Sequence, residues 1–526
     1  MRALGAHPER WWFGLVCAVA LLAFIPSFTS PFQFDDYTFI VGNHVLAAPS
    51  VDGVLQYGRA RALVFASFVL NDQLGGEHPF GYHVGNFLIH LLATWLVYRL
   101  ALTLCRTPRL QHTWLAAQRL PLAVAAAVVF ACHPIQVQGV TYIVQRMSSL
   151  AAMFYVGSLL LYVRARNAQL GLQRGRPALN YAGAALSALA AFTSKENSAS
   201  LPLAILLADW TFYPRTGMGK RVARLAPFLV LVAVIPLAWY FLGKGPGRAP
   251  GMNAPFAEQA EYLLNLLIFR ANPGGSVAPL DYFLTQCVVI PRYLALVFFP
   301  WGLNIDHDVS MATGVSVSVA LGFVFLAALL GFGLYALRRW PLLGFGIVWV
   351  FIGLSVESSF LPIKDAMVEH RMYLAMVGVA LVLGTAFAWA LCQWRLPALV
   401  VGAAVTAGLC VLTFNRNELW RSPVLLWQDA VAKSPYKARV YANLGTALHQ
   451  DGRLVEALEH YCKALALDPT SRQAEANAYA LVGAKMEEDV KKNPSLLEHL
   501  PVGPDGAVEV TVPDPCAPAT AEMLRR

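Results

Sequence analysis

Long apolar stretches alternate with short polar segments along the first 414 residues of the chain. A helix needs about 20 apolar residues to cross the hydrocarbon core of a bilayer. The stretches are continuous rather than alternating, which indicates helices instead of the strands of a barrel. We therefore expect about eleven membrane-spanning helices, at residues 11–29, 84–104, 120–132, 141–163, 179–194, 197–213, 225–243, 314–337, 341–360, 371–393 and 396–414.

The composition agrees with this pattern, because 57% of the 526 residues are hydrophobic and only 13% are charged. The net charge of +9 would suit a nucleic-acid partner, but the Lys and Arg residues cluster in short loops between the apolar stretches. Such loops face the cytoplasm in membrane proteins. We place 105–119, 164–176, 213–224, 337–340 and 392–395 there, exclude nucleic acid, and assign the outer side to 30–83, 133–140, 193–197, 244–313 and 361–371.

Some apolar segments fit other roles. The first stretch follows Arg2 and Arg10 and is interpreted as a retained signal anchor. Residues 286–302 carry Pro291 and Arg292 at their centre, where a lipid-facing charge is costly, so we expect an interfacial or re-entrant helix. The amphipathic stretches 52–74 and 256–271 are expected to be interfacial helices or, alternatively, ordinary loops.

From residue 415 the chain becomes polar, and a repeat is visible in it. Pro435 and Pro469 are 34 residues apart, and the residues between them match a tetratricopeptide unit: Tyr441, Leu444, Gly445, Leu448, Ala457, Tyr461 and Ala464. Gly445 and Ala457 are small, which would let two helices approach closely. We therefore predict an all-α fold with a transmembrane domain at 1–414, a small tetratricopeptide-repeat domain at 415–500 and a Pro-rich, loosely ordered tail at 501–526.

The eight cysteines are scattered, at 17, 105, 132, 287, 392, 410, 462 and 516. They form no Cys-x-x-Cys pair and no Cys/His spacing typical of a metal site. We expect neither a thiolate-bound metal nor a disulfide framework.

Two adjacent acids, Asp35 and Asp36, follow the first helix in the sequence "FDDY". Neighbouring carboxylates at a boundary between water and lipid repel each other and lose hydration, so the pKa of at least one should rise. Such a group can act as a general base near neutral pH. The alternative is that both are solvated loop acids or cap a helix.

Further polar residues fall in the same outer layer. Arg146 lies in apolar surroundings, where it would face an anion such as a lipid phosphate or extend its charged end to the interface. The other candidates are His83, His133, Gln145, Lys195, Glu196, Asp306, His307, Glu369, His370 and Arg371. Each alone would be an ordinary interfacial residue, but together they gather acids, cations and imidazoles on one side.

A metal or nucleotide is not needed to explain these residues. Oxygen and imidazole ligands would suit Mn²⁺ or Mg²⁺ better than Zn²⁺, but no spacing requires a metal and none is assigned. The chain lacks a Gly-rich phosphate loop, and no inverted repeat of broken helices indicates a transporter.

The order of these motifs resembles a known family. "FDD" after the first helix, "HP" opening an outer helix with an Arg, "KE" between the fifth and sixth helices, "EHRMYL" before a late helix and a terminal repeat are similar to the transmembrane, tetratricopeptide-repeat-containing O-mannosyltransferases and their bacterial relatives. Those are glycosyltransferases of the GT-C fold. The resemblance covers residues 11 to about 470, although the eukaryotic members carry many repeats and this chain has scarcely more than one.

The resemblance implies a polyprenyl- or dolichyl-phosphate sugar donor used on the outer face, with the first acid of the pair, Asp35, as general base. Asp36 would orient Asp35 or the acceptor, while Arg146, Lys195 and Arg371 would hold the donor phosphate. A single displacement would invert the anomeric centre, and no further cofactor is implied. The repeat would present a protein acceptor with a Ser or Thr hydroxyl.

Two alternatives stay open: transfer of the sugar to a lipid or polysaccharide, and a non-enzymatic membrane-anchored scaffold whose repeat recruits partners for envelope or pilus assembly. The Ala, Leu and Arg content suggests a GC-rich bacterial genome, hence an inner-membrane protein with a periplasmic repeat. In a eukaryote, the membrane would be that of the endoplasmic reticulum.

Overall fold

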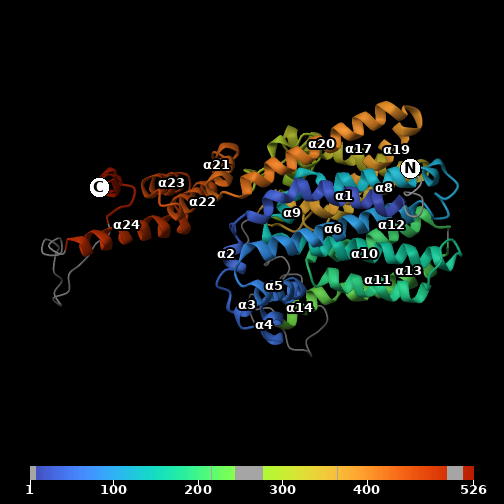
Figure 1. Ribbon diagram of the computed structural model, residues 1–526, viewed down its shortest axis with the longest axis horizontal. Helices are drawn as coiled ribbons and strands as arrows, with labels where there is room; N and C mark the ends of the chain where they lie inside the picture. Colours follow the sequence, from blue (N-terminus) through green and yellow to red (C-terminus); the bar gives the residue numbers. More distant parts are fainter. Residues whose placement is uncertain (1–7, 215, 243–276, 364, 494–512, 526) are drawn as a thin grey trace. The chain divides into compact units, whose positions relative to one another are not determined.

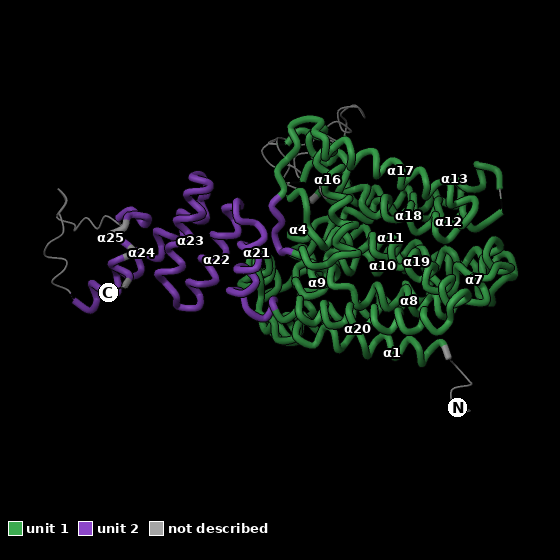
Figure 2. Tube along the Cα trace, turned by 90° about the horizontal axis from the view of Figure 1, so that it is seen from above, with its two compact units in different colours: residues 1–303, 309–418 green, residues 304–308, 419–526 purple. Residues whose placement is uncertain are grey.

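The computed structural model describes residues 8–214, 216–242, 277–363, 365–493 and 513–525, and all of its regular elements there are helices (Figure 1). The chain divides into two compact units, which Figure 2 colours separately. Unit 1 comprises Met1–Leu303 and Val309–Glu418, and unit 2 comprises Asn304–Asp308 and Leu419–Arg526. The all-α expectation is therefore confirmed for the described residues.

Unit 1 is a bundle of long apolar helices. They are α1 (Pro8–Phe24), α6 (Pro79–Leu104), α8 (Arg119–Cys132), α10 (Arg146–Gln169), α11 (Pro177–Phe192), α12 (Leu201–Phe212), α13 (Met218–Val232), α14 (Val234–Leu242), α16 (Pro279–Phe298), α17 (Val317–Arg339), α18 (Pro341–Leu354), α19 (Met372–Gln393) and α20 (Arg395–Trp420), the last of which continues into unit 2. Helix α10 packs against α6, α11, α12 and α19, which explains why most of its side chains are buried.

Eight described helices are long and apolar enough to cross a membrane, or nine if Arg119–Cys132 and Pro134–Val140, which meet at 52°, form one broken span. Our expectation of about eleven was too high. The predicted spans 179–194, 197–213 and 341–360 correspond to helices that are too short to be counted: α11 has 16 residues, α12 has 12 and α18 has 14.

Short helices connect the long ones. At the end of unit 1 where α1 stops and α6 begins lie α2 (Asp36–Phe39), α3 (His44–Ala47), α4 (Val51–Gly58) and α5 (Ala62–Gly75), which Figure 1 shows gathered away from the N-terminus. The remaining short elements are η2 (Ile25–Thr29), η3 (Arg59–Arg61), α7 (Trp114–Ala117), η4 (Pro134–Gln136), α9 (Val137–Val140), η5 (Ile143–Gln145), η6 (Glu196–Ser200), η7 (Pro300–Gly302) and η8 (Glu369–Arg371). We call the end of unit 1 that holds α2, η5, η6 and η8 the outer end.

The amphipathic stretch 52–74 is helical, as α4 and α5, whereas 256–271 lies outside the described residues. Helix α16 covers most of 286–302 and has 20 residues, enough to cross a membrane by length. Its hydrogen bonds nevertheless reach outer-end segments from its first turn to its last: Tyr282 to Glu357, Gln286 to Ala366, Tyr293 to Val368 and Val297 to His133. The interfacial or re-entrant placement of 286–302 stays a prediction, which these contacts with the outer end favour and the length of α16 does not.

Unit 2 consists of α21 (Pro423–Lys433), α22 (Ala438–Gln450), α23 (Leu454–Leu467), α24 (Arg472–Lys492) and α25 (Pro518–Arg525). The expected close approach at Gly445 is confirmed, because a Cβ there would lie 2.7 Å from the ring of Tyr461 and 3.0 Å from the carbonyl oxygen of Ala457. Small residues also form the contact among α22, α23 and α24, through Ala442, Ala464 and Ala474.

The expectation about cysteines was wrong for one pair, since Cys462 and Cys516 form a disulfide. Cys516 lies in the stretch that we expected to be loosely ordered. Residues 513–525 instead form a turn and α25, which packs against α23 and α24. The sequence did not predict this pair, because the two cysteines are 54 residues apart and no local motif connects them.

Candidate active site

Asp36, the first residue of α2, is buried with an exposed fraction of 1%. Its carboxylate accepts hydrogen bonds from the backbone N–H groups of Gln33 at 3.0 Å and Val144 at 2.8 Å. Burial raises the pKa of Asp36 to about 8, although these hydrogen bonds act to lower it. Asp36 thus fastens the turn before α2 to η5. Its proposed orienting role stays a prediction, but it is compatible with this position.

Asp35 is only half-buried, which makes it the more accessible acid of the pair. Its backbone N–H donates to the hydroxyl of Tyr142 at 2.9 Å. The preceding residue, Phe34, has a φ of 47°, in the left-handed region that bulky side chains avoid at a cost of roughly 1–3 kcal/mol. Such strained residues cluster at functional sites. The role of Asp35 as general base stays a prediction.

Lys195 belongs to a buried ion pair. Its Nζ lies 2.7 Å from Oε1 of Glu357 and donates to Oγ of Ser148 at 3.0 Å. Burial lowers the pKa of Lys195, against the effect of Glu357. Burial acts to raise the pKa of Glu357, but Lys195 and Arg371 outweigh it and hold that pKa below its usual range. The pair joins the start of η6 to the segment after α18.

Glu196, the neighbour of Lys195, pairs with a different cation. Arg61 in η3 lies with its Nη2 2.9 Å from Oε2 of Glu196, and its Nη1 contacts Sδ of Met147. The two side chains are 35% and 24% exposed, so this pair lies nearer to solvent than Lys195 does. The pair brings the segment between α4 and α5 to the start of η6.

Arg371 in η8 is buried and donates to neutral oxygens. Its Nη1 reaches the hydroxyl of Tyr282 at 3.1 Å and the carbonyl of Ala366 at 2.9 Å, and its Nη2 reaches the carbonyl of Asp365 at 2.6 Å. Its Nε is buried without a hydrogen-bond partner among the described residues. Arg371 therefore keeps one donor unused.

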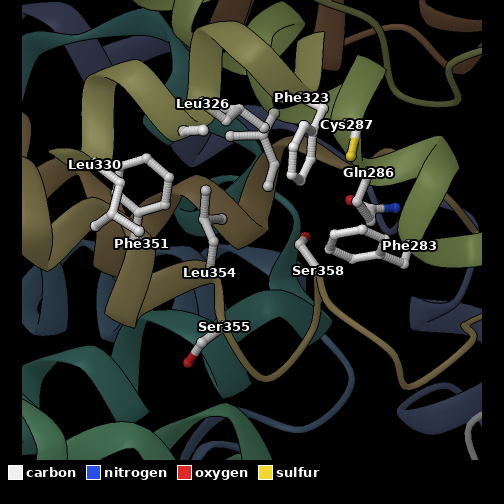
Figure 3. Close-up of a pocket in the computed structure, with 12 residues that line it drawn as sticks. Phe283, Gln286, Cys287, Phe323, Leu326, Leu330, Phe351, Leu354, Ser355 and Ser358 are labelled. Atoms are coloured by element: carbon white, nitrogen blue, oxygen red, sulfur yellow. The ribbon is translucent and has the colours of Figure 1, made fainter. Parts of the chain in front are cut away.

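A cavity of about 380 Å³ opens between α16, α17 and α18 (Figure 3). Most of its lining is apolar: Phe283, Cys287, Ile290, Phe323, Leu326, Ala327, Leu330, Phe351 and Leu354, with Gln286, Ser355 and Ser358 as polar members. Oε1 of Gln286 and Oγ of Ser358 are buried and have no hydrogen-bond partner among the described residues. Nε2 of Gln286 donates to the carbonyl of Ala366, which also accepts from Arg371. The polar side of the cavity is thus one residue away from the guanidinium.

One short segment connects the acids to the cations. Val144 in η5 binds the carboxylate of Asp36, and Ser148 in the first turn of α10 binds Lys195. These two anchors are four residues apart, which is about 6 Å along a helix axis. The structure therefore brings Asp36 and Lys195 into one neighbourhood at the outer end.

Arg146 lies on the same segment, but its guanidinium is enclosed. It donates to Oδ1 of Asn86 at 2.5 Å, to the carbonyl of Ser67 at 3.1 Å and to the carbonyl of Tyr82 at 3.0 Å, and it lies over the ring of Phe68 at 4.7 Å. Only 1% of the residue is exposed. In this position Arg146 holds α5, α6 and α10 together. Its predicted contact with the donor phosphate stays untested.

The other candidates at the outer end have mainly internal partners. Nε2 of His83 lies 2.9 Å from the carbonyl of Ser30, and Nε2 of His133 lies 2.8 Å from that of Val297. Gln145 accepts from Ser148 at 3.2 Å, and His370 bonds to Gln138. Glu369 is buried beside His370. Their roles in substrate binding stay predictions.

Asp306 and His307 belong to unit 2, and their roles in substrate binding stay predictions. Asp306 binds Lys437 at 2.6 Å and accepts two hydrogen bonds from Arg439. Burial acts to raise the pKa of Asp306, but the two cations outweigh it and hold that pKa below its usual range. The carbonyl of His307 also accepts from Lys437. These contacts fasten residues 304–308 to the start of α22.

Sequence reasoning missed Arg61 and Glu357. Arg61 lies in the stretch interpreted as an interfacial helix, and Glu357 lies in the apolar context "GLSVESSF". A charge within apolar sequence was the available signal, but its partner could not be read from it. The described residues contain no group of three His, Cys, Asp or Glu side chains arranged to hold a metal ion. Whether a metal takes part stays a prediction.

No family model matches the chain, but curated relatives do. It is 22% identical over 483 residues to a protein O-mannosyl-transferase of Caenorhabditis elegans, covering 87% of this chain and 63% of the relative. It is 26% identical over 511 residues to the protein O-mannosyl-transferase TMTC4 of Homo sapiens, covering 86% and 66%. It is 29% identical over 583 residues to the protein O-mannosyl-transferase Tmtc1 of Drosophila melanogaster, covering 91% of this chain and 64% of the relative.

Among solved structures, ArnT from Cupriavidus metallidurans bound to undecaprenyl phosphate aligns over 95% of this chain and 82% of that chain, with a TM-score of 0.45 and 15% identity. The chain spans 63–66% of the length of the three curated relatives, so most of this chain aligns with only a part of each relative. The long alignments make this chain a distant homologue of the protein O-mannosyl-transferases.

Proposed function

We propose that the protein is an integral-membrane glycosyltransferase of the GT-C type, which transfers a sugar from a polyprenyl-phosphate-linked donor to a Ser or Thr hydroxyl of a protein. The names of the curated relatives support the reaction class and the hydroxyl acceptor. They also make a mannosyl donor the first to test. The chain's own residues supply the remaining argument.

The observation that carries the proposal is the segment from η5 into α10, which binds Asp36 at one anchor and Lys195 at the other. A glycosyl transfer from a phosphate needs a base on one side of the anomeric carbon and positive charge on the other. An acid pair and a cationic group bound to one segment, through anchors that are four residues apart, meet this requirement. Both lie at the outer end of the bundle.

Asp35 would take the proton of the acceptor hydroxyl as it attacks the anomeric carbon. Asp36 keeps the turn that carries Asp35 in place, through Gln33 and Val144. The phosphate leaves as an anion and needs no general acid, only positive charge to stabilise it. Lys195 and Arg371 are the best-placed cations, and a single displacement of this kind inverts the anomeric centre.

The cavity between α16, α17 and α18 suits an isoprenoid chain, because its lining is nearly all apolar. Gln286 and Ser358 offer unpartnered polar atoms there. Arg371 shares the carbonyl of Ala366 with Gln286. A donor with its chain in this cavity would carry its phosphate to the cations.

We further propose that α21–α24 form a tetratricopeptide-type repeat that presents the acceptor on the periplasmic or lumenal side. The helix pairs and the close approach at Gly445 support the repeat. The Cys462–Cys516 disulfide supports an oxidising compartment, since such bonds are rare in the cytosol. A bacterial inner membrane with unit 2 in the periplasm fits both.

The test is transfer of labelled sugar from a polyprenyl-phosphate donor to protein in membranes that contain the chain. Asp35→Asn should lower the rate by about 10²–10⁴-fold without changing the amount of protein. Asp52→Asn, which removes an exposed acid at the start of α4, is the matched control and should retain the rate. Undiminished transfer by Asp35→Asn would refute the assignment of the base. Labelled lipid or polysaccharide in place of protein would change the acceptor, and no donor use at all would favour a scaffold.

A further inference from the structure

A second charged cluster lies at the other end of α10, away from Asp35. Asp209, near the end of α12, accepts hydrogen bonds from the hydroxyl of Tyr162 at 3.0 Å and from Nε of Arg166 at 3.1 Å. Arg224 lies 3.5 Å and Arg221 lies 3.7 Å from its other oxygen. The ends of three helices, α10, α12 and α13, therefore meet at one carboxylate.

The charges in this cluster do not balance. Three guanidinium groups surround one carboxylate, and the side chains of Arg166 and Arg221 are only 6% and 4% exposed. Among the described residues, Asp209 is the only acid that pairs with any of these three arginines. Removing an ion from water costs several kcal/mol unless an opposite charge compensates it. The cluster holds two positive charges that the described chain leaves uncompensated.

Hydrogen-bonding capacity is also left over there. Nη1 of Arg221 is buried without a hydrogen-bond partner among the described residues, as is Oδ2 of Asp209. Buried polar atoms of native proteins nearly always find partners. An unused guanidinium donor beside an excess of positive charge fits an anion with several acceptor oxygens, such as a phosphate, while Oδ2 of Asp209 limits how close the anion can come to that side.

The aromatic residues indicate the depth of the cluster. Arg221 lies over the ring of Trp210 at 4.8 Å, and this indole is 56% exposed. Exposed Trp residues at helix ends are typical of the headgroup level of a membrane. Figure 1 shows α12 and α13 at the end of the bundle where α1 begins, and there the Lys- and Arg-rich loops predict the cytoplasmic face. A phosphate at this level belongs to a lipid.

We propose that Arg166, Arg221 and Arg224 bind the phosphate of an anionic phospholipid at the cytoplasmic ends of α10, α12 and α13. The site is independent of the transfer reaction at the outer end. The bound phosphate would fix α13 to the leaflet. Helix α13 is apolar and packs on α11 and α12, but most of it is exposed. Phosphatidylglycerol has the required phosphate with one negative charge. In phosphatidylcholine, the choline cation cancels the negative charge of the phosphate.

The test measures the thermal midpoint, Tm, of the purified full-length protein in a neutral detergent. We add phosphatidylglycerol, phosphatidylcholine or inorganic phosphate to the wild type, to Arg221→Gln and to Arg224→Gln. The matched control is Lys220→Gln, which removes the same charge from an exposed neighbour on α13. Arg224 is 22% exposed, so its replacement keeps the test open if Arg221→Gln does not fold.

Phosphatidylglycerol should raise the Tm of the wild type and of Lys220→Gln by at least about 3 °C, and that of the two arginine variants by less than half as much. Phosphatidylcholine should have no such effect. An equal response of the wild type and both arginine variants to phosphatidylglycerol would overturn the site. An equal response to inorganic phosphate or phosphatidylcholine would overturn the assignment to an anionic lipid.

Discussion

At the scale of single residues, two adjacent carboxylates of the same chemistry have different surroundings. Asp36 is enclosed and bonded to backbone N–H groups, whereas Asp35 is half-buried behind a strained residue. Although the two residues are adjacent in the sequence, the side chain of Asp36 is buried and Asp35 is partly exposed. Asp36 therefore holds the turn, whereas the role of Asp35 as general base rests on its greater exposure and stays a prediction.

The raised pKa of Asp36 predicts a dependence of stability on pH. The folded state holds this proton up to a pKa of about 8, and the unfolded state releases it near 4. The contribution of Asp36 is therefore largest below pH 4 and declines as the pH rises to 8, by at most about 1.4 kcal/mol per pH unit. Asp36→Asn should flatten this decline. Thermal melts of both proteins between pH 5 and 8 check it, and parallel curves would contradict it.

The ion pair between Lys195 and Glu357 predicts strong coupling. Removing Glu357 leaves Lys195 buried without a compensating charge, whereas removing Lys195 leaves Glu357 with Arg371 and Arg61, so Glu357→Gln should cost roughly 3–5 kcal/mol of stability and Lys195→Met less. The double variant should cost less than the sum of the two. Unfolding titrations of the four proteins measure the coupling energy. Additive effects would show that the pair does not act as a unit.

The sequence predicted Lys195, Glu196 and Arg371 as members of one layer, but not their partners. Glu357 is 162 residues from Lys195, and Arg61 is 135 residues from Glu196. A charged residue in apolar sequence indicates that a partner exists without indicating which one. For the same reason Arg146 looked suited to an outside anion, although Asn86, Ser67 and Tyr82 already surround it.

At the scale of elements, apolar periodicity predicted most helices but not where they lie. Helix α16 has the length of a span, and its hydrogen bonds reach segments of the outer end. The sequence signal against a crossing helix is Pro291 and Arg292 at its centre, and that interpretation stays a prediction, since composition over 20 residues does not separate a crossing helix from a lying one. The count of spans was too high because three of the predicted spans are helices of only 16, 12 and 14 residues.

The contact between α16 and α17 predicts how the cavity responds to substitution. A Cβ at Gly322 would lie 2.0 Å from the carbonyl oxygen of Cys287, so Gly322→Ala must push α16 away from α17. Gly331, two turns further along α17, has nothing within 4 Å of such a Cβ. Gly322→Ala should lower the Tm by several degrees and raise the KM for the lipid-linked donor several-fold. Gly331→Ala, the control, should be neutral or slightly stabilising.

Equal behaviour of the two glycine variants would contradict a tight contact at Gly322. A lower Tm with an unchanged KM would mean that the contact supports the fold but that the donor chain lies elsewhere. The two readings are thus separated by the pair of measurements.

At the scale of the whole molecule, the two units differ in how they are held together. The six cysteines of unit 1 are free, and the two of unit 2 form the disulfide, so all eight in the chain are accounted for. Reduction therefore acts on one bond. The closed loop of about 54 residues gives a chain-entropy contribution of roughly 4 kcal/mol. Such a bond matters most in a small unit, where the apolar core is limited.

Cys516→Ser should therefore destabilise unit 2 alone. Proteolysis is expected to reach α24 and α25 several-fold faster in this variant, or in the wild type with a reductant, while the fragments from unit 1 keep their rate. Cys392→Ser, which replaces an exposed free cysteine of unit 1, is the matched control and should behave like the wild type. In intact cells, Cys462 and Cys516 should react with a thiol reagent only after reduction. Ready labelling without reductant would place unit 2 in a reducing compartment and remove the support that the disulfide lends to a periplasmic or lumenal acceptor.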